Sequence, residues 1–212
     1  MADLEFFFDP VCPWAWITSR WVSEVQQLRD YDVQWRFISL AVLNENLVAD
    51  WYTPAYRAGH MLGLHSMRVC DAVRLAHGNQ AVGDVYTALG TTLHKDQNRA
   101  SLETDLQASI AALLTDIGMD PALAAAVNDE DHDAYIRADT ALALERTGKD
   151  VGTPILTFHP GRSTEGSFFG PVISTIPRGD EALRLWDAIE VVATSSGMAE
   201  LKRSNRSRPV FD

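Results

Sequence analysis

Cys12 is the residue with the clearest potential for chemistry. It follows a short apolar run, Leu4–Phe8, that is closed by Pro10, and it directly precedes Pro13. An apolar run closed by proline is typical of a buried strand, and proline suits the first turn of a helix. The sulfur is therefore expected at the amino end of a helix, where unpaired N–H groups stabilise a thiolate and lower the cysteine pKa. A buried structural cysteine is the alternative.

The other potential ligands and motifs predict no further chemistry. Neither Cys70 nor any of the six histidines forms a Cys-x-x-Cys or His-x-x-x-His pair, so no metal site is expected. The chain contains no Gly-x-Gly-x-x-Gly or P-loop pattern, so no nucleotide held by such a fingerprint is expected. Cys70 lies in a predicted helix, and its expected role is core packing, with resolution of a Cys12 disulfide as the alternative.

Composition limits the class of protein. Of the 212 residues, 46% are hydrophobic and 22% are charged, and the net charge is −11. This is enough apolar material for a core, and the negative charge argues against nucleic acid or an anionic membrane as a partner. The acidic start lacks the basic stretch of a secretory signal, and no run of about 18 apolar residues occurs. We expect a cytoplasmic enzyme, as a monomer or homodimer, with no disulfide framework.

The elements around Cys12 alternate between strand and helix. Apolar residues recur at helical spacing from Pro13 to Leu28, and residues 33–39 then alternate as in a strand. Almost only helical patterns follow, at residues 54–77, 82–94, 102–117, 123–127 and 131–146. Strand character returns at residues 154–158 and 167–169, and residues 177–193 predict a final helix before a basic surface tail.

This order resembles a thioredoxin core, β-α-β then β-β-α, whose halves are joined by helices. We predict an α/β thioredoxin-like domain of residues 1–43 and 150–212, and an all-helical insertion domain of residues 44–149. In thioredoxin-like enzymes, an X-Pro bond at the start of the third core strand is cis and lies against the catalytic sulfur. Thr153-Pro154 takes that place, so its bond is expected to be cis, with the backbone of Thr153 exposed to a bound thiol or peptide.

Longer motifs carry a more specific resemblance. The segments FDPVCPWAW (residues 8–16) and DVGTP (residues 150–154) resemble the DsbA-like branch of the thioredoxin superfamily. Together with residues 39–46, 168–171 and 176–179 and the end of the chain, they are similar to actinobacterial mycothiol-dependent reductases that reduce nitro prodrugs. The resemblance implies an oxidoreductase in which Cys12 exchanges electrons with mycothiol or a similar low-molecular-weight thiol. Its substrates would be disulfides or nitro and other electrophilic small molecules.

The motif departs from the family pattern at one position. The family carries Cys-Pro-Trp-Cys, whereas the fourth residue here is Ala15. A dithiol enzyme attacks with its first cysteine and releases product with its second, so Cys12 is expected to form a mixed disulfide but no local internal one. Two explanations stay open: a natural monothiol enzyme resolved by a small thiol, or an engineered replacement that traps an intermediate.

The resemblance also implies binding residues. Trp14 would flank the sulfur and offer a flat apolar face to a substrate, or else pack against the insertion. Asn44 and Tyr56 are implied to face the cleft beside the sulfur, where an amide and a phenol hold a polar substrate group. Local capping and core packing are the alternatives for both. His94, at a predicted helix end, is a further candidate for substrate binding.

Two other functions are consistent with parts of the pattern. Kappa-class glutathione transferases and chromene-carboxylate isomerases share a thioredoxin core with a helical insertion and bind a thiol cofactor, but their motif carries Ser where Cys12 stands. The other is a non-enzymatic, thioredoxin-like binding module that lost turnover together with the second cysteine. An ordinary Cys12 pKa of about 8.5 would favour that module.

Overall fold

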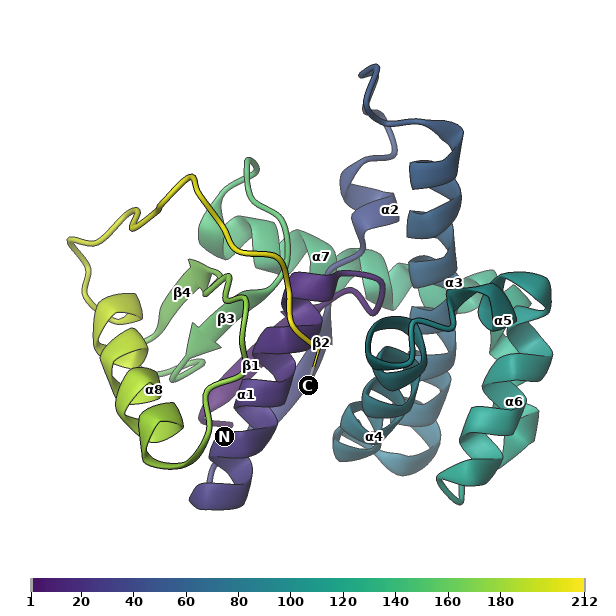
Figure 1. Ribbon diagram of the computed structural model, residues 1–212, viewed down its shortest axis with the longest axis horizontal. Helices are drawn as coiled ribbons and strands as arrows, with labels where there is room; N and C mark the ends of the chain where they lie inside the picture. Colours follow the sequence, from purple (N-terminus) through teal and green to yellow (C-terminus); the bar gives the residue numbers. More distant parts are fainter. Residues whose placement is uncertain (1, 212) are drawn as a thin grey trace. The chain divides into compact units, whose positions relative to one another are not determined.

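Strands lie towards both ends of the chain, and most of the helices lie between them (Figure 1). The structure is a computed structural model that describes residues 2–211. Met1 and Asp212, the ends of the predicted thioredoxin-like domain, lie outside the described residues. The strands are β1 (Leu4–Phe8), β2 (Val33–Phe37), β3 (Ile155–Phe158) and β4 (Gly166–Phe169). The α-helices are α1 (Pro13–Leu28), α2 (Leu40–Leu43), α3 (Pro54–His77), α4 (Asn79–Gly90), α5 (Arg99–Thr104), α6 (Leu106–Asp116), α7 (Asp133–Thr147) and α8 (Gly179–Ala193). A π-helix, η1 (Thr91–Lys95), and two 3₁₀ helices, η2 (Pro121–Asn128) and η3 (Glu130–His132), complete the set within the described residues.

The chain divides into two compact units. The sheet unit comprises the described residues of Met1–Phe8, Cys12–Arg36 and Ala143–Asp212, and the helical unit comprises Asp9–Val11 and Phe37–Leu142. The helical unit begins before residue 44 because the backbone N–H groups of Phe37 and Ser39 donate to side chains of α7, over 3.1 and 3.0 Å. The predicted domain limits, after residues 43 and 149, stay a prediction.

The sheet explains how distant segments come together around Cys12. Its strand order is β2-β1-β3-β4. β1 pairs antiparallel with β3, in a register that sets Phe7 opposite Ile155, and β3 pairs antiparallel with β4. The end of β1, which leads to Cys12, therefore lies beside the start of β3, which follows Pro154. Both strands are buried along their whole length.

An aromatic cluster fixes α1 and α8 against this sheet. The rings of Trp21 on α1 and Trp186 on α8 meet edge to face, with centroids 5.1 Å apart, and Phe158 of β3 lies 5.4 Å from Trp186. The indole N–H of Trp21 also donates to the carbonyl of Ala182, over 3.0 Å. All three rings are fully buried. Aromatic burial of this extent dominates the energetics of a small core, so it holds α1 and α8 in place on the sheet.

The helical unit is organised by its longest helix, α3. Thr53 caps it, because its hydroxyl accepts from the N–H of Tyr56, and Gly78 ends it with a φ of +85°. The predicted helix over residues 54–77 is confirmed. Its fully buried side chains include Met67, Val69, Cys70 and Val73. This apolar face packs within the helical unit, where α3 contacts α4 and η2 (Figure 1).

Three predicted boundaries are wrong, each for a local reason. The helix predicted over residues 102–117 is two helices, because Asp105 is extended and its side chain caps α6 by accepting from the N–H of Ala108. The helix predicted over residues 82–94 begins at Asn79 and changes to the π-helix η1 at Thr91. The second strand ends at Phe37, because Ser39 is the N-cap of α2.

At Gly166, β4 packs closely against the end of α8. A Cβ atom added there would overlap the carbonyl oxygen of Ala193 and would lie 2.8 Å from the Cα of Thr194. Both neighbours are backbone atoms, so Gly166→Ala is expected to lower the free energy of unfolding by about 1–3 kcal/mol. Chemical denaturation measures the change.

Gly197→Ala is the control for this substitution. Gly197 has no neighbour within 4 Å of the added Cβ, so its variant is expected to stay within about 0.5 kcal/mol of the native protein. Equal stabilities of the two variants would contradict close packing at Gly166.

Candidate active site

Cys12 occupies the N-cap of α1, as the sequence predicted. Its backbone is extended, its carbonyl accepts from the N–H of Trp16 over 3.0 Å, and Pro13 takes the first helical position. No side-chain hydrogen bond caps this helix end. The free amide groups and the aligned peptide dipoles of a 16-residue helix therefore act at the position of the sulfur. A helix end of this kind helps to stabilise a thiolate, which is consistent with the predicted reactivity of Cys12.

The Thr153-Pro154 peptide lies against the sulfur. The predicted cis bond is confirmed. The thiol of Cys12 donates to the carbonyl oxygen of Thr153, with 3.5 Å between sulfur and oxygen. The hydroxyl of Thr153 donates to the carbonyl of Phe7, over 3.4 Å, and the N–H of Gly170 donates to the carbonyl of Pro154, over 2.8 Å. Contacts to the ends of β1 and β4 thus hold the segment beside Cys12.

The sulfur is close to buried, with 7% of Cys12 exposed. Ala15, one turn along α1, is fully buried, and Trp14 between them is half-buried. The guanidinium carbon of Arg206 lies 6.0 Å from the centroid of the Trp14 ring. The motif therefore combines one nearly enclosed sulfur, one partly open indole and a methyl group in the place of a second sulfur.

Cys70 has the character of a core residue. It lies on α3 in the helical unit, is fully buried, and forms no disulfide. Burial, the largest cause, together with the nearby Asp71 and Asp9, raises the pKa of the Cys70 thiol far above its ordinary range. A thiol held in the neutral form is a poor nucleophile, so the structure favours the predicted packing role.

Asn44, Tyr56 and His94 all belong to the helical unit, and each makes its own local contacts. Asn44 ends α2, and its amide nitrogen donates to the carbonyl of Leu40, over 2.8 Å. Tyr56 is 56% exposed, and its ring contacts those of Trp51 and His60. The predicted capping alternative thus applies to Asn44, whereas Tyr56 is an open aromatic side chain. The substrate-binding roles of all three stay a prediction.

His94 holds the chain just before Cys12. Its Nε2 lies 2.9 Å from the carbonyl oxygen of Pro10, which can only accept, so this nitrogen carries the proton. Burial, the main cause, lowers the pKa of His94 to about 4. The imidazole is therefore neutral at physiological pH, and its contact anchors the Asp9–Val11 segment to η1.

Asp9 is a buried acid whose importance the sequence pattern did not reveal. It is fully buried, and its two oxygens accept separate backbone N–H groups, from Val11 over 3.1 Å and from Leu40 over 2.8 Å. On α3, a Cβ added to Gly63 would overlap the carboxyl group, so any larger residue there would displace Asp9. Desolvation, only partly offset by the two N–H groups, raises the pKa of Asp9 to about 7. The sequence offered one signal for this role: Asp9 lies between an apolar strand and the Pro10-Val11-Cys12 segment.

A cavity of about 300 Å³ lies within the helical unit. Its lining includes Tyr52 and Met61 together with charged groups of both signs. Arg68 pairs with Asp133 over 2.7 Å, and Arg137 pairs with Glu45 over 2.9 Å. Such a lining suits a small polar molecule with little net charge, because most of the guanidinium groups already have acidic partners.

The family follows from a match that spans the motif and most of the chain. A family model described as Rv2466c-like, mycothiol-dependent nitroreductase Rv2466c, matches residues 11–203. The chain belongs to this family. The uncharacterized protein Rv2286c of Mycobacterium tuberculosis is a relative, 32% identical over 205 residues that cover 96% of this chain and 82% of that protein. The resemblance drawn from the motifs is confirmed.

Solved structures confirm the fold. The cytosolic disulfide reductase DsbM of Pseudomonas aeruginosa with GSH aligns with a TM-score of 0.60 at 13% identity, covering 88% of this chain and 98% of that one. A putative protein disulfide isomerase from Nitrosomonas europaea aligns with a TM-score of 0.55 at 17% identity, covering 89% and 96%. The predicted α/β, thioredoxin-like, DsbA-like fold with a large helical insertion is confirmed.

Family membership defines the class of this enzyme. As a member of this mycothiol-dependent family, the protein is a thiol–disulfide oxidoreductase, and a low-molecular-weight thiol supplies its reducing equivalents. Among residues 2–211, no group of three His, Cys, Asp or Glu side chains is placed to hold a metal ion. Within the same residues, no helix has the length and apolar character needed to cross a membrane.

Asp9 makes a specific contribution to the pH dependence of stability. Its pKa rises from 3.8 to about 7 on folding, so the folded protein keeps the proton to a higher pH than the unfolded chain. Its contribution is fully present below about pH 4 and is lost as the pH rises to about 7, by roughly 1.4 kcal/mol per pH unit. Asp9→Asn, which cannot ionise, is expected to show a flatter profile of unfolding free energy between pH 5 and 8.

Denaturant unfolding across this pH range measures the effect. Asp84→Asn on the exposed surface of α4 removes one acid of the same type without touching the buried site, so it should keep the native profile. A native-like slope in Asp9→Asn would show that Asp9 does not hold its proton in the folded state.

Proposed function

We propose that the protein is a monothiol reductase in which Cys12 forms a mixed disulfide that a low-molecular-weight thiol resolves. The contact between the Cys12 sulfur and the Thr153 carbonyl, at the amino end of α1, carries this proposal. It supports the proposal because the sulfur lies against the buried Thr153 backbone and no sulfur occupies position 15. The family match supports mycothiol as the thiol.

The reaction has two exchange steps. The Cys12 thiolate attacks a disulfide, forms a mixed disulfide with one half, and releases the other half as a thiolate, which takes up a proton. A mycothiol thiolate then attacks the other sulfur of the mixed disulfide, that of the bound half, forms a new disulfide with that half, and releases the Cys12 thiolate. For a nitro substrate, reduction to the nitroso compound consumes two thiols and yields one disulfide and one water.

The surroundings of Cys12 support both steps. A thiolate stabilised by α1 is a good leaving group, so resolution by the external thiol is fast when the attacking thiol has a pKa near the ambient pH. The Thr153 backbone, held by β1, offers its polar groups to the incoming thiol. We place the reaction in the cytoplasm, because a single reactive thiol stays reduced only in reducing surroundings.

Asn44 and Tyr56 are the proposed binding residues for polar groups of the thiol or of the substrate. The exposure of Tyr56 supports this role, as does the polar cavity of the helical unit, whose lining includes Glu45 and Arg57, the residues that directly follow Asn44 and Tyr56. For His94 the contacts favour a positioning role, because its Nε2 donates to the Pro10 carbonyl.

Mass spectrometry after incubation with oxidised mycothiol tests the mixed disulfide. We expect one mycothiol adduct per native chain, located on Cys12, because Cys70 is buried and its thiol stays protonated. Cys70→Ser should keep the adduct and Cys12→Ser should abolish it. An unmodified Cys12 in folded protein over a range of pH would sink the proposal. Reductase activity that survives Cys12→Ser would point instead to a kappa-class type of thiol-cofactor chemistry.

Ala15→Cys tests the monothiol route. Residues 12 and 15 are neighbours on the first turn of α1, so a second thiol there is within reach of an internal disulfide. If the monothiol route is native, turnover of a disulfide or nitro substrate with mycothiol should stay within about twofold in the variant. Turnover that rises about tenfold or more, with an internal disulfide seen by mass, would mark Ala15 as a replacement of the resolving cysteine.

A further inference from the structure

The segment that follows α8 carries an isolated positive charge cluster. Between Glu200 and Asp212, the charged residues are all basic: Lys202, Arg203, Arg206 and Arg208. The net charge of the whole chain is −11, so this cluster opposes the charge of the molecule. Basic residues in a short exposed segment usually serve only solubility, unless the segment is held at one place on the protein.

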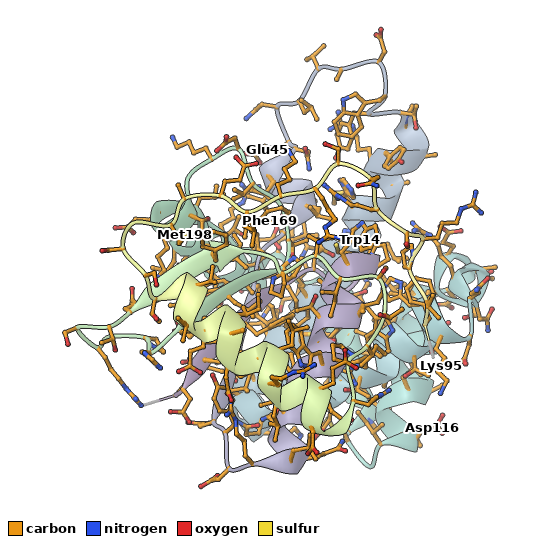
Figure 2. The ribbon with its side chains drawn as sticks, turned by 60° about the vertical axis from the view of Figure 1, so that its left-hand side comes forward. Trp14, Glu45, Lys95, Asp116, Phe169 and Met198 are labelled. Carbon is orange, nitrogen blue, oxygen red and sulfur yellow. The ribbon has the colours of Figure 1, made fainter. Side chains whose placement is uncertain are left out.

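The structure holds this segment beside the active-site motif, within the sheet unit. The N–H of Val210 donates to the carbonyl of Ser174, over 2.8 Å, and Phe211 is half-buried. In Figures 1 and 2 the segment, drawn in yellow, passes the amino end of α1. Trp14, at this end of the helix, is labelled in Figure 2. Arg206 is exposed, and its guanidinium carbon lies 6.0 Å from the centroid of the Trp14 ring, within cation–π range.

Trp14 and Arg206 together form a composite surface next to the sulfur. Trp14 is the second residue of α1, two positions after Cys12, and is half-buried, so part of its ring stays open. The indole offers a flat apolar face, and the guanidinium offers planar donors that match a carboxylate. The Trp14 indole and the Arg206 guanidinium therefore complement a particular kind of substrate for Cys12. Such a substrate has an aromatic or flat apolar body and an anionic group.

We propose that Arg206 is a specificity-determining residue that selects anionic, carboxylate-bearing disulfides for reaction at Cys12. This inference rests on the proposed function, because it names the substrate class of the same sulfur. The step is a thiol–disulfide exchange: the Cys12 thiolate bonds to one sulfur of the substrate, and the other half leaves as a carboxylate-bearing thiolate. Arg206 acts on the bound carboxylate and takes no part in bond formation.

Two aryl disulfides that differ in charge test the assignment. 5,5′-Dithiobis-(2-nitrobenzoate) carries two carboxylates, whereas 2,2′-dithiodipyridine is uncharged at neutral pH, and both release a coloured thiolate or thione when Cys12 reacts. Rate constants are measured at fixed pH for the native chain, Arg206→Gln, Arg206→Lys and Arg203→Gln. Arg203→Gln is the matched control, because it removes the same charge from the same exposed segment.

Arg206→Gln is expected to slow the reaction of the dianionic disulfide by about fivefold and to leave the uncharged one within about twofold. Arg206→Lys should retain most of the preference, because it keeps the charge. Arg203→Gln should leave both rates within about twofold. Salt at about 0.5 M should reduce the native preference for the dianion and should have less effect in Arg206→Gln.

Equal slowing of both disulfides by Arg206→Gln would overturn the proposal, since it would mean that Arg206 acts on the sulfur and not on the substrate charge. Unchanged rates in Arg206→Gln, or an equal loss in Arg203→Gln, would also overturn it. Failure of the proposed function itself is a separate result: the native Cys12 would react with neither disulfide.

Discussion

The pairing of β1 with β3 holds the Cys12 sulfur against the Thr153 carbonyl, and every other feature of the site is arranged around that contact. The register places Phe7 opposite Ile155, so the end of β1 and the start of β3 lie side by side at one end of the two central strands. The cluster of Trp21, Trp186 and Phe158 then holds α1 and α8 against the sheet. A helix that started one residue later would move its free N–H groups away from the sulfur.

Side-chain hydrogen bonds hold the segment between β1 and α1. Asp9 supplies two acceptors to backbone N–H groups, and His94 donates to the Pro10 carbonyl, so three consecutive residues before Cys12 have buried polar anchors. Neither group carries a full charge at neutral pH, since His94, with a pKa of about 4, is neutral and Asp9, with a pKa of about 7, is only partly ionised. A buried loop of this type avoids the desolvation cost of a full charge.

Local sequence signals were enough to predict the parts of the site that are close together in the chain. Pro13 after an apolar run predicted the helix start, because that depends on backbone chemistry within a few residues. The cis bond of Thr153-Pro154 was predicted instead from the resemblance to thioredoxin-like enzymes. Asp105 was read as helix interior, since an aspartate in a helical pattern also fits a surface position and only its φ of −152° shows the break. Asp9 and Arg206 were missed for a different reason. Their environments depend on Leu40, Gly63 and Trp14, which tertiary packing alone brings near them.

On the proposed monothiol route, the methyl group of Ala15 changes which concentrations set the oxidation state of Cys12. An enzyme with two neighbouring sulfurs equilibrates with a thiol pool through two molecules of thiol, so its oxidised fraction depends on the square of the thiol concentration divided by the disulfide concentration. A single sulfur reacts with one disulfide, forms one mixed disulfide and releases one thiol. Its oxidised fraction therefore depends only on the ratio of the disulfide concentration to the thiol concentration. Dilution or growth of the whole pool at constant ratio then leaves the state of Cys12 unchanged. On the proposed monothiol route, with alanine at position 15, the protein would therefore respond to how oxidised its thiol pool is and not to how large that pool is.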